Sequence, residues 1–245
     1  MYNRPQSVKS YLTTNQKRIR RRLLELLYKT HSSHIGSCVS VIDLLDCIYA
    51  VKRKNEKFIL SNGHSAAALY VILEKYNYLK SPDIKRLGVH PNRNQKIGID
   101  VSTGSLGQGL PIAVGMALSD RKKTVYCCIS DGECAEGSMW ESFRVINDFA
   151  LNNLKIILSA NGWGAYDRIS PVTLKKRLHG FGFDIKEIDG HDTHEIIKKI
   201  KIATKRPALF FAKTNSEQLP FLRGVDAHYY IMTDADYTIA KKLLQ

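Results

Sequence analysis

The chain has 245 residues, which is enough for one large α/β domain or two small ones. Hydrophobic residues make up 44% and charged residues 24%, as in an ordinary globular protein. No run approaches the roughly 18 consecutive apolar residues that a membrane-spanning helix needs. The N-terminal residues 1–22 are polar and then basic, without the apolar centre of a secretory signal, so we expect a cytoplasmic protein.

The formal net charge of +14 raises the question of nucleic-acid binding. A nucleic-acid-binding face usually combines a continuous basic stripe with aromatic residues. Here the basic residues fall in separate clusters, at residues 17–22, 52–54, 121–123, 175–177 and 198–206. We therefore interpret them as solvated faces and do not expect a nucleic-acid partner, although the positive field suits phosphorylated substrates. The five cysteines show no repeated metal-type spacing, and Cys127 and Cys128, in an apolar run, are expected in the core.

The first half of the chain is mainly helical by its apolar spacing. A helix is predicted over residues 17–29, because Ile19, Leu23, Leu26 and Leu27 lie on one helical face. The expected elements that follow are a polar turn at 30–40, a helix at 41–51, a strand at 58–62, a Gly-rich turn at 103–105 and a buried helix at 106–118.

The second half alternates strands with helices. Strands are predicted at 124–129, 155–159, 185–188 and 208–212, with helices at 138–150 and 191–204 between them. This pattern predicts a doubly wound α/β domain spanning 1–245, with a mainly parallel sheet and helices on both faces. In such folds ligands bind at the carboxyl ends of the strands.

Two predicted strands end in polar residues that suit a metal. Asp131-Gly132 follows one strand, and Asn161-Gly162 follows the next. Magnesium takes about six hard oxygens, and one or two protein side chains with phosphate oxygens and water can provide them. The alternative is that Asp131 caps a helix and Asn161-Gly162 forms an ordinary turn. Spacing alone does not decide between these readings.

Several motifs occur in one order along the chain, and their sequence resembles the N-terminal half of the transketolase family. The matching stretches are His34-Ile35-Gly36-Ser37, Phe58-Ile59-Leu60-Ser61-Asn62-Gly63-His64, Ser102-Thr103-Gly104-Ser105-Leu106-Gly107-Gln108-Gly109, Asp131-Gly132-Glu133 with Glu136-Gly137, Trp140-Glu141 and Asp189-Gly190-His191-Asp192. The resemblance runs from about Arg18 to Leu244. It implies the diphosphate-binding domain of a thiamine diphosphate enzyme.

The resemblance also implies roles for individual residues. The cofactors are thiamine diphosphate and Mg²⁺ (or Ca²⁺ or Mn²⁺), with metal ligands Asp131, Asn161 and the carbonyl of Trp163. The implied cofactor-binding residues are His64, Gly104, Leu106, Gly132, Asn161 and His228. The implied catalytic residues are His34, His64, His90 and His228, which handle protons of a sugar substrate. Glu136 and Glu141 match carboxylates at a dimer interface.

The pyrimidine-binding and C-terminal domains of the family have no counterpart here, and neither does the glutamate that activates the cofactor. The resemblance therefore implies the N-terminal subunit of a split transketolase, which acts on sugar phosphates in a heterotetramer with a separate subunit. Ser130, Ser159-Ala160 and the glycine-free stretch 213–218 depart from the family pattern, and the last puts His228 in doubt. The alternatives are a thiamine enzyme acting on a 2-oxo acid and a non-catalytic binding protein.

Overall fold

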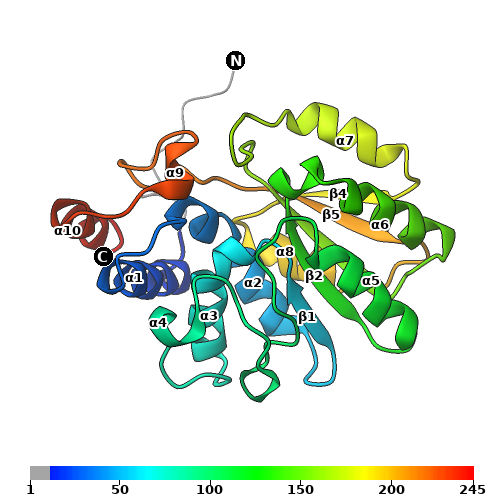
Figure 1. The fold of residues 1–245 in the computed structure, drawn as a ribbon, viewed down its shortest axis with the longest axis horizontal. Coiled ribbons are helices and arrows are strands. Elements are labelled where there is room, and N and C mark those ends of the chain that lie inside the picture. Colours follow the sequence, from blue (N-terminus) through cyan, green and yellow to red (C-terminus); the bar gives the residue numbers. More distant parts are fainter. Residues whose placement is uncertain (1–11) are drawn as a thin grey trace.

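A computed structural model describes residues 12–245, so residues 1–11 of the polar N-terminus lie outside the described part. In the described residues the centre of the fold is a five-stranded sheet in which all neighbouring strands pair in parallel. Its spatial order is β1-β2-β3-β5-β4 (Figure 1). The strands are β1 (Lys57–Leu60), β2 (Val125–Ser130), β3 (Leu154–Ala160), β4 (Asp184–Asp189) and β5 (Ala208–Lys213). The predicted α/β fold with a parallel sheet is confirmed.

Helices cover both faces of this sheet. They are α1 (Thr14–Lys29), α2 (Ile35–Val51), α3 (Ala66–Lys75), α4 (Ile84–Leu87), α5 (Gly109–Ser119), α6 (Gly137–Asp148), α7 (Pro171–His179), α8 (Thr193–Ile200), α9 (Asp226–Tyr229) and α10 (Asp234–Leu243), with short 3₁₀ helices η2 (Gly63–Ser65), η3 (Gln95–Ile97) and η4 (Gly132–Ala135). The sequence did not predict α3, α7 or α10. No helix within residues 12–245 is long and apolar enough to cross a membrane.

The two faces of the sheet belong to two apolar cores, and β2 shows how one strand serves both. Cys128 packs in the core formed with α1, α2, α3 and α8, whereas Cys127 packs in the core formed with α5, α6 and α7. All of β2 is buried. A parallel strand covered on both faces has a continuous apolar run instead of an alternating one. The predicted core position of both cysteines is confirmed.

Helix α2 begins six residues earlier than the sequence predicted, at Ile35 instead of 41. Residue His34 precedes it in a left-handed conformation, with φ 66° and ψ 25°. This conformation is accompanied by a hydrogen bond of 2.7 Å from His34 N to His228 O. Every residue from Ile35 to Tyr49 is buried. The polar residues of the first turn therefore lie inside the protein, where they do not show the amphipathic pattern of a surface helix.

Candidate functional site

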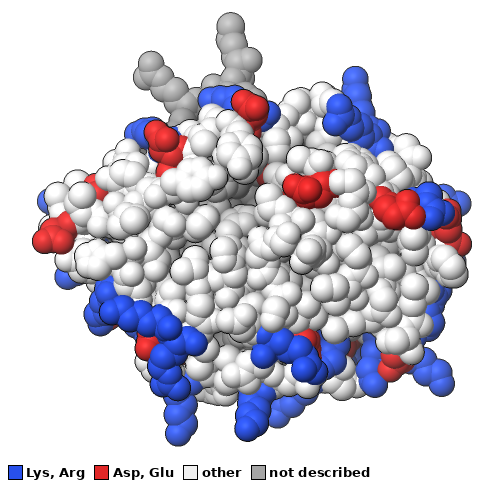
Figure 2. All heavy atoms as spheres, in the orientation of Figure 1, with Lys and Arg blue, Asp and Glu red and all other residues white. Residues whose placement is uncertain are grey.

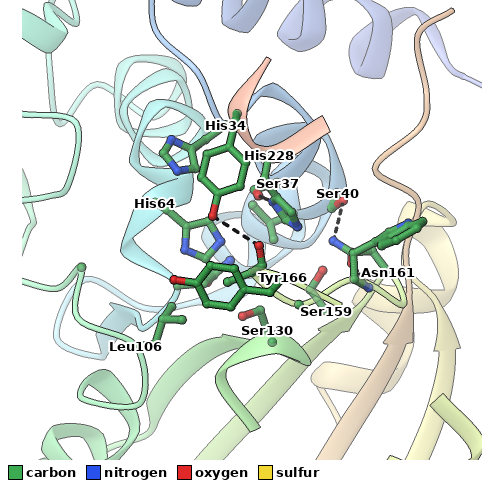
Figure 3. Close-up of a pocket in the computed structure, with 18 of the residues that line it drawn as sticks. His34, Ser37, Ser40, His64, Leu106, Ser130, Ser159, Asn161, Tyr166 and His228 are labelled. Atoms are coloured by element: carbon green, nitrogen blue, oxygen red, sulfur yellow. Dashed lines mark hydrogen bonds between the residues drawn. The ribbon is translucent and has the colours of Figure 1, made fainter. Parts of the chain in front are cut away.

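A pocket lies where the carboxyl ends of β1, β2 and β3 meet the first turn of α2 and helix α9 (Figure 3). Among the described residues, no Lys, Arg, Asp or Glu lines it. The lining residues that the sequence predicted for the site are His34, His64, His90, Gly104, Leu106, Gly132, Asn161, Trp163 and His228. The fold thus brings together residues spread over almost 200 positions of the chain.

The four predicted histidines form one cluster. His34 precedes α2, His64 lies in η2, His90 follows α4 and His228 lies in α9. The ring centroids of His34 and His64 are 5.7 Å apart, those of His34 and His90 6.3 Å, and those of His64 and His228 6.2 Å. A single polar ligand can therefore meet several imidazoles at once.

Burial favours the neutral form of His34, His64 and His228. It lowers the pKa of His64 to about 3 and that of His34 to about 4, and the neighbouring histidines add to both effects. Burial also lowers the pKa of His228. At neutral pH each of these rings therefore has one N–H donor and one acceptor nitrogen. Such rings can both accept and donate a hydrogen bond at a substrate hydroxyl.

Two buried polar atoms beside the cluster have no hydrogen-bond partner among residues 12–245. His228 is 9% exposed, and its Nδ1 lies 2.6 Å from Ser37 Oγ while its Nε2 is unpaired. Asn62 is 1% exposed, and its Oδ1 is also unpaired. Since unpaired buried polar atoms are costly, the two atoms fit a ligand that supplies polar groups here. His228 thus lines the pocket, although the stretch 213–218 that precedes it lacks the glycines of the family pattern.

Ser37 and Asn62 were overlooked in the sequence, although both stand inside motifs that were recognised. Each is a polar residue within three positions of a motif histidine, and both line the pocket. Ser40, one turn further along α2, also lines it and accepts a hydrogen bond of 3.3 Å from Asn161 Nδ2 (Figure 3). A polar residue in a helix that is otherwise buried and apolar was the available signal.

The predicted metal ligands Asp131 and Asn161 belong to adjoining strand ends that are bonded together. Asp131 is 1% exposed, and its carboxylate accepts hydrogen bonds from Gly132 N at 3.0 Å and from Gly162 N at 2.7 Å. The Oδ1 of Asn161 accepts a hydrogen bond of 2.9 Å from Trp163 N. The bond from Gly132 N matches the alternative in which Asp131 caps a helix, here η4. The bond from Gly162 N also connects Asp131 to the loop that contains Asn161.

The carboxylate of Asp131 does not line the pocket itself but a neighbouring hollow, together with Cys134 and Arg168. Burial raises its pKa to about 7, against the opposing effect of the backbone N–H groups of Gly162 and Gly132. A cation near this carboxylate would favour its charged form. The donor set of one carboxylate, one amide oxygen and the carbonyl of Trp163 fits Mg²⁺.

Close backbone approaches shape the Gly-rich loop over the pocket. Gly104 has φ +149°, and a Cβ at this position would lie 2.9 Å from the His90 ring. A Cβ at Gly109, the first residue of α5, would lie 2.5 Å from Ser61 Cα. Glycine at these positions therefore allows the loop to pack against His90 and against the strand end that leads to His64.

The two glutamates that match the dimer contact lie at the surface of the single chain. Glu141 is exposed and pairs with Arg144 at 2.5 Å, and Glu136 is half-buried just before α6. Glu133, for which the sequence predicted no role, is instead fully buried.

Comparisons with known proteins agree with this geometry. Residues 13–218 match the family described as "Transketolase, thiamine diphosphate binding domain". An apulose-4-phosphate transketolase subunit of Phocaeicola vulgatus is 29% identical over 89% of this chain and 88% of its own length. The 6-deoxy-6-sulfo-D-fructose transketolase subunit SqwG of Clostridium sp. is 30% identical over 80% of this chain and 82% of its own length.

Among solved structures, the transketolase of Campylobacter jejuni is similar, with a TM-score of 0.79 and 25% sequence identity over 94% of this chain. The present chain spans 42% of that protein. The matched residues include the strand ends that carry Asp131 and Asn161. They also include three of the four pocket histidines, all except His228. The chain therefore belongs to the transketolase family, through its thiamine diphosphate-binding domain.

Proposed function

We propose that this chain is the diphosphate-binding subunit of a split transketolase that depends on thiamine diphosphate and magnesium. With a separate pyrimidine-domain subunit, it transfers a two-carbon ketol unit from a ketose to an aldose. The observation that carries the proposal is the pocket itself, where His34, His64, His90 and His228 gather beside the bonded strand ends of Asp131 and Asn161. The names of the two relatives above, each a transketolase subunit, add support.

In this proposal the loops after β2 and β3 hold the diphosphate end of the cofactor. Asp131, Asn161 and the carbonyl of Trp163 would bind Mg²⁺, and the amide of Gly132 would face a diphosphate oxygen. A Cβ at position 132 would come within 3.3 Å of Gly164 Cα, so the backbone of the two loops is already close. The unpaired Nε2 of His228 suits an oxygen of the same group.

The histidines would handle protons on the substrate. The chemistry that thiamine diphosphate supplies when bound is carbanion stabilisation beside the ketose carbonyl. His34, His64 and His90 line the same pocket as the backbone of Gly104 and Leu106, so they can face the hydroxyl groups of a ketose or aldose there. Because burial keeps His34 and His64 neutral, each has one nitrogen that can accept a hydrogen bond from a substrate hydroxyl and one N–H that can donate to it.

The face around the pocket suits a protein partner. In Figure 2 the centre of the face in view is almost free of charged side chains, and Lys and Arg gather towards its rim. Tyr166 and Tyr229 line the pocket with exposed fractions of 85% and 54%. Large apolar side chains on an uncharged surface are typical of interfaces. The partner would supply the activating glutamate and the grip on the sugar phosphate, for which the described pocket residues offer no Lys or Arg.

A second uncharged surface suits contact between two copies of this chain. Helix α5 has no charged residue among its 11 residues, yet Ile112 and Leu118 are each 38% exposed. An entirely apolar helix is usually buried on all sides. The adjoining helix α6 follows Glu136 and contains Glu141, the residues implied in the family's dimer contact. Two copies joined at this contact, each with one partner subunit, would give the proposed heterotetramer.

The first test is reconstitution with a candidate pyrimidine-domain subunit, Mg²⁺ and thiamine diphosphate. Two-carbon transfer from a ketose phosphate to an aldose phosphate is the expected result. Decarboxylation of a 2-oxo acid without ketol transfer would favour the other thiamine-enzyme reading. Tight, salt-dependent nucleic-acid binding without any effect of thiamine diphosphate on thermal stability would favour a non-catalytic binding protein.

The second test addresses the metal site. Asp131→Ala should abolish magnesium-dependent binding of thiamine diphosphate while circular dichroism remains that of the wild type. The control is Asp120→Asn, which changes a surface carboxylate paired with Lys123 and should bind as the wild type does. Unchanged affinity in Asp131→Ala would remove Asp131 from the metal site.

A further inference from the structure

Glu133 is a buried carboxylate that accepts hydrogen bonds from three separate segments. It lies in η4, two residues after Asp131, and its exposed fraction is 0%. Its Oε1 accepts hydrogen bonds from Ser61 Oγ at 2.6 Å and from Gly107 N at 3.1 Å. Its Oε2 accepts a hydrogen bond of 3.0 Å from Ser130 N. These bonds compensate for the burial of the carboxylate.

Each of the three donors belongs to a segment that forms a different part of the pocket wall. Ser61 directly follows β1 and precedes Asn62-Gly63-His64. Gly107 belongs to the loop that contains Gly104 and Leu106. Ser130 ends β2 and directly precedes Asp131. One carboxylate therefore connects the turn that contains His64, the Gly-rich loop and the end of β2, which leads to Asp131.

The backbone N–H and C=O of Gly107 both bind the Gly-rich loop to the segment after Asp131. Gly107 N donates to Glu133, and Gly107 O accepts a hydrogen bond of 2.8 Å from Ser138 Oγ. Gly107 has φ +76°, and a Cβ there would lie 2.6 Å from the Cβ of Glu136. The missing side chain therefore leaves room for Glu136 and Ser138 to pack directly against the loop backbone. The position of the loop thus depends directly on the residues at 133–138.

We propose that Glu133 is a positioning residue for the cofactor site, which fixes the Gly-rich loop and the His64 turn relative to Asp131. The inference rests on the proposed function. Glu133 does not line the pocket, so it acts through Ser61, Gly107 and Ser130. Mutation of residues that orient metal-binding groups from behind typically lowers metal affinity or activity by about 10–100-fold.

Substitution by glutamine isolates this role because it preserves size and removes one acceptor. Whichever way the new amide is oriented, its NH₂ group faces either Ser130 N or Gly107 N. Two donors then face each other, and one buried backbone N–H loses its acceptor. The matched control is Asp148→Asn on α6, which alters an exposed carboxylate paired with Arg144.

The first measurement uses the chain without cofactor. Hydrogen–deuterium exchange should become faster at Gly107 or Ser130 in Glu133→Gln, whereas peptides of α10 and the Asp148→Asn variant exchange as in the wild type. Unchanged exchange at both amides would overturn the inference, whatever the enzyme proves to do. If Glu133→Gln does not fold, Ser61→Ala removes a single donor, and the inference then requires faster exchange near Gly107.

The second measurement is the magnesium concentration for half-maximal binding of thiamine diphosphate, followed by the fluorescence of Trp163 and Trp140. We expect this magnesium concentration to rise about tenfold or more in Glu133→Gln. Hydrogen–deuterium exchange in α10 should remain unchanged. Equal magnesium requirements in wild type and Glu133→Gln would refute the positioning role. Failure of the wild type to bind the cofactor would instead refute the proposed function, and the exchange result would still test the contacts of Glu133.

Discussion

Asp43 and His191 are joined by a hydrogen bond of 2.8 Å between Asp43 Oδ2 and His191 Nδ1, although 148 residues separate them. Asn215 N donates to His191 Nε2 at 3.0 Å, so Nε2 is the acceptor and Nδ1 carries the hydrogen. The same carboxylate pairs with the buried guanidinium of Arg20. The bonds connect α1 and α2 with the loops after β4 and β5. His191 is therefore a structural residue.

The first prediction concerns this buried ion pair. Burial opposes ionisation of Asp43, but Arg20 and His191 bring its pKa down to about 2. Asp43→Ala leaves the Arg20 guanidinium, 2% exposed, without its partner. We expect the free energy of unfolding to fall by about 3–5 kcal/mol in urea denaturation.

The control for that experiment is Asp148→Asn, which removes an exposed pair with Arg144. Exposed pairs contribute about 0–1 kcal/mol. Similar losses in the two variants would show that burial does not set the strength of the Arg20–Asp43 pair.

A second prediction contrasts two glycines of α5. A Cβ at Gly109 would lie 2.5 Å from the backbone of Ser61, whereas at Gly115 nothing lies within 4 Å. Gly109→Ala should lower the free energy of unfolding by about 1–3 kcal/mol through overpacking. Gly115→Ala should raise it by about 0.5–1 kcal/mol, because alanine restricts the unfolded chain and favours the helix. Opposite signs in thermal or urea unfolding are the expected result, and a loss in both variants would contradict it.

The third prediction follows from the burial of His64. Its pKa is lowered from 6.5 to about 3, so the unfolded chain binds a proton below pH 6.5 that the folded chain does not. The free energy of unfolding must therefore fall as the pH drops from 6.5. One group contributes at most ~1.4 kcal/mol per pH unit.

His64→Gln removes this contribution. Between pH 7 and pH 5 the variant should lose roughly 1–2 kcal/mol less stability than the wild type. Urea denaturation of both proteins at several pH values measures the difference. Parallel curves would mean that His64 titrates alike in the folded and unfolded chain.

The fourth prediction concerns thiol reactivity. All five cysteines are free and buried in the described part of the chain. Burial raises the pKa of Cys38 to about 12 and that of Cys127 well above its ordinary value, so the reactive thiolate is scarce. A chromogenic thiol reagent should label the native protein slowly and should label five thiols after denaturation. Rapid labelling of the native protein would place at least one thiol at the surface.

Much of the fold was predictable because its signals are local. The strands β2, β3 and β5 are apolar runs bounded by turn residues, and they were predicted to within two residues at each end. Helix α1 was predicted from one apolar face. The start of α2 was missed because a helix that is buried all round has no polar face, and because its first two turns carry the polar residues Ser37 and Ser40.

The sequence by itself determined the class of the fold and many residues of the pocket, since apolar periodicity and family motifs can be read without coordinates. Only the tertiary structure decided how those residues meet. It brought His228 to Ser37, placed Asp131 behind the Asn161 loop, and buried Glu133 among three strand and loop ends. The physical reason is that burial and hydrogen-bond partners depend on segments far apart in the chain, and no local pattern records which donor a buried carboxylate will meet.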